Sequence, residues 1–169
     1  MLAIKILIYS GIFLTCSAIG ILKSQKYIYR VNELKEFKNA LNMFKTKIKF
    51  TYEPIPDIFE QIASSINPDI GIIFKIASHN MKFCPAGDSW NKAIDNDLLN
   101  INSEDKNILK DLSKLLGATD MQGQISQIEV TSNFLDEQIK KAEKEKEKNE
   151  GMYRKLGMII GLSIVIILI

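Results

Sequence analysis

The sequence predicts an all-α protein, with an apolar helix at each end and a helical bundle between them. Apolar residues recur every three or four positions through most of the chain, and no alternating strand pattern competes with that period. Residues 1–22 and 156–169 are almost free of charge, whereas the region between them is rich in Lys and Glu. We therefore expect an N-terminal transmembrane helix over 1–22, a helical bundle over 23–155 and a C-terminal membrane segment over 156–169.

The composition excludes some classes of protein. The chain has 169 residues, the size of a single domain, and a formal net charge of +2. Because its Lys residues alternate with Glu, this small excess does not indicate a nucleic-acid binder. Cys16 lies in an apolar run and Cys84 in a loop, so we do not expect them to pair, which fits a reducing compartment.

The N-terminal apolar run is long enough to cross a bilayer, since a spanning helix needs about 20 residues. Two alternatives are a cleaved signal peptide ending near Ala18 and a lipoprotein signal at Cys16. Both fit poorly, because Cys16-Ser17-Ala18 is a poor substitute for Ala-x-Ala and Phe13-Leu14-Thr15 before Cys16 lacks the usual order of leucine and small residues. We therefore predict a retained anchor.

Basic residues flank the central region at both of its membrane exits. Lys23, Lys26 and Arg30 follow the first apolar run, and Arg154 and Lys155 precede the second. By the positive-inside rule this places the central region in the cytoplasm. The last run, 156–169, is shorter than a full span, so partial insertion is the alternative there.

The central region reads as short helices separated by caps and breakers. The first helix should run from the membrane into water and end before Pro54 and Pro56. Further on, polar residues precede apolar periodic stretches, as helix caps do. The expected caps and stops, in chain order, are Asn67, Asp88 or Ser89, Ser103, Gly117 and Thr119.

The last helix should start with a Thr-x-x-Gln capping box at Thr119. It then carries a heptad-like apolar seam, which we expect to pack on its own bundle, with self-association as the alternative. The seam consists of Met121, Ile125, Ile128, Leu135, Ile139 and Ala142. Lys and Glu then fill 140–150, which we interpret as a solvated helix face, with a docking surface for a partner as the alternative.

No pattern of catalytic, cofactor-binding or metal-binding residues emerges. His79 has no His, Cys or Asp at ligand spacing, and no Gly-x-x-x-x-Gly-Lys phosphate loop occurs. The rival hypothesis is a small membrane-bound enzyme acting on lipid or peptide. It would use the clustered carboxylates of Glu53, Asp57 and Glu60.

Several short motifs, in order and across nearly the whole chain, resemble the stage III sporulation protein AB family of endospore-forming bacteria. They are Arg30-Val31-Asn32-Glu33-Leu34, Thr51-Tyr52-Glu53-Pro54-Ile55-Pro56, Ser103-Glu104-Asp105, Leu116-Gly117-Ala118-Thr119-Asp120 with Gln124, and Met152-Tyr153-Arg154-Lys155-Leu156-Gly157. Positions that match the family's motifs are Glu33, Pro54, Pro56, Gly117, Asp120, Gln124, Tyr153, Arg154 and Gly157. Ala118 and Met121 depart from the pattern inside the Gly-x-x-Asp block.

The resemblance implies a bundle similar to the helical domains of the F-type inner-membrane platform protein of type II secretion. It further implies a structural role in the channel complex between mother cell and forespore. The protein would sit in the outer forespore membrane, on the mother-cell side, with a secretion-type ATPase as its cytoplasmic partner.

The turn after the first helix is the predicted partner-binding surface. Two prolines stiffen it, and a preordered corner loses little entropy on docking. Interfaces favour aromatic and apolar anchors. The candidate residues are Tyr52, Pro54, Ile55 and Pro56.

Overall fold

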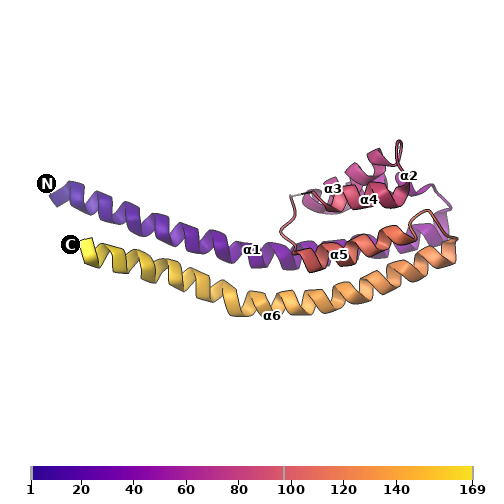
Figure 1. Cartoon of the computed structure of the whole chain (residues 1–169). Helices are drawn as coiled ribbons and strands as arrows, with labels where there is room; N and C mark the ends of the chain where they lie inside the picture. Colours follow the sequence, from indigo (N-terminus) through magenta and orange to yellow (C-terminus); the bar gives the residue numbers. More distant parts are fainter. Residues whose placement is uncertain (1, 97, 169) are drawn as a thin grey trace. The chain divides into compact units, whose positions relative to one another are not determined.

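The computed structural model describes residues 2–96 and 98–168, and these form helices, turns and loops without a strand. The predicted all-α fold, with a long apolar helix near each end, is confirmed. Figure 1 shows the six α-helices and their order. They are α1 (Leu2–Thr51), α2 (Ile55–Ser65), α3 (Pro68–Asn80), α4 (Ala86–Ile94), α5 (Ser103–Asp111) and α6 (Met121–Leu168), with a 3-10 turn, η1 (Leu112–Lys114), after α5.

The chain folds as two compact units. The two-helix unit consists of Met1–Val31 and Lys141–Ile169, and the helical domain consists of Asn32–Lys140. Helices α1 and α6 contribute to both units, and each is long and apolar enough to cross a membrane. In the two-helix unit these helices lie side by side (Figure 1), and the Tyr9 hydroxyl donates to the Leu168 carbonyl at 2.8 Å.

Helix α1 ends at Thr51, as the prolines predicted. Tyr52 adopts a φ of 53°, and Pro54 then takes an extended conformation as the N-cap of α2. A positive φ is rare for a bulky residue, so the chain turns here at some cost in backbone strain. The Ser78 hydroxyl on α3 donates a hydrogen bond to the Pro56 carbonyl at the start of α2, at 2.9 Å.

The core of the helical domain is a cluster of aromatic rings. Phe59 is in ring contact with Phe44, Phe74 and Trp90, at centroid separations of 4.9, 5.1 and 5.7 Å. Trp90 and Phe74 are 5.2 Å apart. Each of these side chains is fully buried. The rings come from α1, α2, α3 and α4, so one cluster joins four helices.

The part of α6 that belongs to the helical domain, up to Lys140, packs within it through a mixed seam. Ile128, Leu135 and Ile139 are buried, whereas Met121 and Ile125 are only half-buried. Polar bonds to α5 supplement this seam: Gln127 Nε2 donates to the Asp111 carbonyl at 3.0 Å, and Gln138 Nε2 to Glu104 Oε1 at 2.8 Å. The seam therefore packs on its own bundle.

The predicted start of α3 is confirmed, and the predicted start of α5 is shifted by one residue. Asn67 caps α3, accepting from the Asp69 amide, with proline in the first turn. For α5 the cap is Asn102 and not Ser103. Asn102 accepts from the Asp105 amide at 2.8 Å, and Asp105 accepts from the Asn102 amide at 3.0 Å. An amide side chain three residues before an acid completes the reciprocal box.

The predicted cap of α4 was wrong. The helix begins at Ala86 behind Pro85, whose extended conformation (φ −54°, ψ 150°) provides the entry without a side-chain cap. Asp88 therefore lies in the first turn, and Ser89 is buried with its hydroxyl donating to the Cys84 carbonyl at 3.3 Å.

The predicted cap of α6 was also wrong by one residue. The Gly123 amide donates to Asp120 Oδ1 at 2.9 Å, so Asp120 is the N-cap. Thr119 Oγ1 reaches only Asp120 Oδ1, at 3.4 Å. A charged acceptor three residues before an amide outcompetes the neighbouring hydroxyl, and its negative charge suits the helix N-terminus.

Replacing Asp120 by Ala should destabilise the helical domain by about 0.5–2 kcal/mol, because the Gly123 amide loses its acceptor. The measurement is a thermal melt of the full-length protein in detergent, followed by circular dichroism. Thr119→Ala is the matched control and should change the melting temperature less. An equal or larger effect at Thr119 would contradict the assignment of the cap.

Candidate functional site

Small residues let the two membrane helices approach closely in the two-helix unit. A Cβ added at Gly157 would lie 2.8 Å from the Cys16 carbonyl oxygen and 3.0 Å from the Gly20 Cα. A Cβ added at Gly20 would lie 2.7 Å from the Tyr153 carbonyl oxygen. Gly161, one turn further on, is also buried. Small residues spaced by four allow such backbone contact between membrane helices, where lipid supplies no hydrophobic drive.

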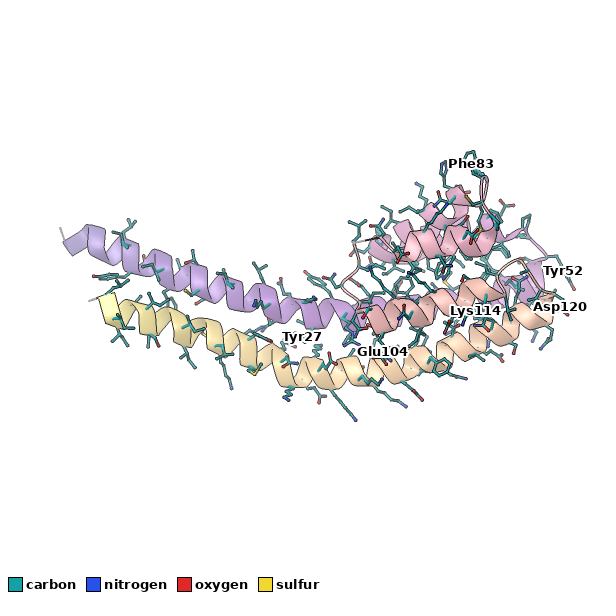
Figure 2. The ribbon with its side chains drawn as sticks, in the orientation of Figure 1. Tyr27, Tyr52, Phe83, Glu104, Lys114 and Asp120 are labelled. Carbon is teal, nitrogen blue, oxygen red and sulfur yellow. The ribbon has the colours of Figure 1, made fainter. Side chains whose placement is uncertain are left out.

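A set of polar and aromatic contacts holds the same two helices together beyond the glycines. Tyr27 and Tyr153 stack with centroids 5.8 Å apart and an interplanar angle of 18°, and Tyr27 lies between the helices in Figure 2. Arg30, with only 8% of its side chain exposed, contacts Glu145 Oε2 at 2.6 Å. We call the contacts Tyr27–Tyr153, Arg30–Glu145 and Ser24–Arg154 the interhelix clasp.

Ser24 and Arg154 complete the interhelix clasp on its apolar side. The buried Ser24 hydroxyl accepts a hydrogen bond from Arg154 Nε at 3.2 Å, and Arg154 also pairs with Glu150 at 3.1 Å. The family-motif positions Tyr153, Arg154 and Gly157 thus all serve this one contact between helices.

Glu33 ties α1 to the loop before α5 within the helical domain. Its carboxylate accepts from the Asn100 amide at 2.7 Å and from Asn100 Nδ2 at 2.6 Å. Burial raises the pKa of Glu33 above its usual value, and the two hydrogen bonds offset this only in part. Glu33 therefore positions a loop, which gives this motif residue a structural task.

The predicted partner-binding turn is only partly accessible. Tyr52 is 82% exposed and projects from the helical domain (Figure 2), and Pro54 is exposed too. Ile55 and Pro56 are half-buried. Ile55 lies near Gly117, which has the predicted left-handed φ of 71°. The helix that Gly117 was expected to stop ends earlier, with α5 at Asp111 and η1 at Lys114. Tyr52 and Pro54 are thus the outward residues of this turn.

A second aromatic side chain lies beside the turn. Phe50, in the last turn of α1, is 68% exposed, with the Lys49 ammonium 5.3 Å from its ring centroid. A shallow groove runs along α1 next to it, lined by Asn42, Met43, Thr46, Lys47, Phe50 and Thr51. We call Phe50, Tyr52 and Pro54 the α1 corner. Exposed aromatic residues on a rigid element are typical anchors for a protein partner.

The remaining motif residues support the start of α6. Asp120 caps the helix, and Gln124 Nε2 donates to the Thr119 carbonyl at 3.2 Å. Both contacts order the loop that follows Gly117 and leads into α6.

The carboxylates of the enzyme hypothesis do not converge on a common point. Glu53 Oε2 accepts from Gln61 Nε2 at 2.6 Å, whereas Asp57 and Glu60 are exposed on α2. His79 is exposed, with its ring 5.8 Å from that of Phe83. Within residues 2–96 and 98–168, no three His, Cys, Asp or Glu side chains form a group that could hold a metal ion.

Sequence reasoning missed the contacts between α1 and α6. The spacing Gly157-x-x-x-Gly161 was a readable signal for close helix packing. No comparable signal marked Ser24, Arg30 or Glu145, because their partners are more than 100 residues away along the chain.

Three comparisons with known proteins point the same way. A family model described as Stage III sporulation protein AB matches residues 5–169. A curated relative, Stage III sporulation protein AB of Bacillus subtilis (strain 168), is 23% identical over 146 residues, which cover 84% of this chain and 85% of that protein. A solved structure of Stage III sporulation protein AB (SpoIIIAB) is similar with a TM-score of 0.65 and 20% identity, covering 70% of this chain and 96% of that one. This similarity supports the all-helical fold.

The close approach of α1 and α6 can be tested with a cysteine. In a Cys84→Ser background, Gly161→Cys should form a disulfide with the native Cys16 under mild oxidation, because a Cβ at 161 lies 3.1 Å from the Cys16 Cβ. Small shifts would bring this pair to the usual Cβ separation of about 3.5–4.5 Å. The readout is protection of both thiols from a mass-tagged maleimide in denatured protein.

Gly151→Cys is the control, because no atom lies within 4 Å of a Cβ there. Equal protection in both variants would refute the packing.

Proposed function

Because the chain belongs to the stage III sporulation protein AB family, we propose that it is a structural membrane component of a sporulation channel complex. In this proposal it acts as a platform that couples a cytoplasmic secretion-type ATPase to the membrane assembly between mother cell and forespore. The family membership supports the setting in sporulation. The α1 corner is the observation that supports a partner-binding role.

The α1 corner suits a protein partner for physical reasons. Phe50 and Tyr52 expose large aromatic surfaces, which contribute strongly to binding when a partner removes them from water. The corner lies at the end of a continuous helix, includes Pro54 and is followed by Pro56, so little conformational entropy is lost on docking. The same helix begins in the apolar segment, so a partner at the corner would bind the chain that is anchored in the membrane.

In the proposed topology both apolar segments enter the outer forespore membrane and the helical domain faces the mother-cell cytoplasm. The basic residues beside both apolar segments support this orientation. In the two-helix unit the far ends of α1 and α6 meet at Tyr9 and Leu168, as expected for two segments that enter from one side.

The orientation predicts the labelling of Cys84. In intact cells this half-buried thiol should not react with a membrane-impermeant maleimide, and it should react after lysis. A Cys16→Ser background leaves Cys84 as the only thiol in the chain. Labelling before lysis would contradict the cytoplasmic placement.

The partner-binding role predicts the effect of a single substitution at the α1 corner. Tyr52→Ser should weaken capture of the purified ATPase by the full-length protein roughly tenfold or more, since anchor residues dominate interfaces. Phe83→Ser is a matched control, because Phe83 is 77% exposed at a different corner of the helical domain (Figure 2). Capture is measured by pull-down, and helix content by circular dichroism on the same samples.

If both variants capture the ATPase as well as the unaltered protein does, the α1 corner is not its docking surface. If Phe83→Ser loses capture and Tyr52→Ser keeps it, the interface lies at the α3–α4 turn instead.

A further inference from the structure

Five basic residues lie where the two apolar segments leave the membrane, and the structure divides them into two kinds. The arginines are engaged within the two-helix unit: Arg30 contacts Glu145 at 2.6 Å, and Arg154 contacts Glu150 at 3.1 Å and Ser24 at 3.2 Å. Both arginines therefore stabilise the interhelix clasp, and both have carboxylates beside them.

The lysines are of the second kind. Lys23, Lys26 and Lys155 are exposed, and within the described part of the chain none of them forms an ion pair or a hydrogen bond. Residues 1–32 and 151–168 contain no Asp or Glu. On α6, Glu145 and Glu150 pair with the arginines. Within the described residues, no carboxylate thus pairs with these three ammonium groups.

Helix packing places these lysines at nearly one depth. The contact between Gly20 and Gly157 sets the register of α1 against α6. Going outward from it, Lys23 lies level with Arg154, Lys155 lies level with Leu22, and Lys26 follows one turn later. With a rise of 1.5 Å per residue, the three lysines fall within about 6 Å along the helix axes. We call Lys23, Lys26 and Lys155 the lysine collar.

We propose that the lysine collar binds the headgroups of anionic phospholipids. The segments on one side of the collar, 1–22 and 156–169, are mostly apolar, with Lys5 as their one charged side chain. The Tyr27–Tyr153 stack lies beside the collar, as aromatic side chains do at a membrane interface. A lysine ammonium is a compact charge on a flexible stem and reaches phosphates without a fixed geometry. Each lysine at an anionic surface strengthens binding about fivefold.

The ligand is the lipid and not free phosphate, because the apolar segments hold the collar at the depth of the headgroups. This binding is independent of the α1 corner and of any ATPase. It would select the lipids that surround the two-helix unit and fix how deeply the unit sits.

The test is lipid retention by the full-length protein in neutral detergent, titrated with phosphatidylglycerol or phosphatidylcholine and observed by native mass spectrometry. The unaltered protein should retain phosphatidylglycerol in preference to phosphatidylcholine. In Lys23→Gln/Lys26→Gln/Lys155→Gln that preference should fall by about tenfold or more. Soluble glycerol phosphate at millimolar concentration should not displace the lipid.

Two matched variants make the result specific. Lys75→Gln/Lys82→Gln/Lys92→Gln removes the same charge from exposed positions on the helical domain and should leave the preference unchanged. Lys23→Arg/Lys26→Arg/Lys155→Arg keeps the charge and should preserve it. The proposal fails if the first Gln variant keeps its preference, if both Gln variants lose it equally, or if glycerol phosphate competes.

Discussion

The helical domain depends on the contacts of the Phe59 ring. This ring meets Phe44, Phe74 and Trp90 edge-on, and each such aromatic pair adds about 0.5–1.5 kcal/mol beyond the burial of its surface. Trp90 Nε1 donates to the Leu109 carbonyl at 2.6 Å, which extends the cluster to α5. Five helices are therefore oriented around one set of rings, and the exposed α1 corner is rigid because the core behind it is.

The two-helix unit is stabilised by different forces. In lipid, burying apolar side chains against one another gains little, so close backbone contact and interhelix polar bonds carry the association. The glycines allow the close backbone contact. The interhelix clasp provides the polar bonds, just outside the apolar segments. The arginines bind groups of the protein because a guanidinium can contact several partners at once. The lysines face the surroundings because an ammonium group is strongly hydrated.

A structural role fits the distribution of motif residues. Glu33 holds a loop, Gly117 ends a turn, Asp120 caps α6, and Gly157 allows helix contact. Each has a packing or hydrogen-bonding task, and these tasks are spread over both units. Glu33 and Gly157 lie on α1 and α6 themselves, and Asp120 lies directly before α6.

The sequence alone determined the all-α class, the end of α1, the start of α3 and the left-handed conformation of Gly117. These depend on period, proline and glycine, which act within a few residues. The starts of α5 and α6 were missed because adjacent polar residues compete for one cap, and the start of α4 was missed because Pro85 begins that helix without a side-chain cap. Only the tertiary structure decided which basic side chains bind groups of the other long helix. Arg30 and Ser24 on α1 contact residues of α6, a helix that begins about 90 residues later.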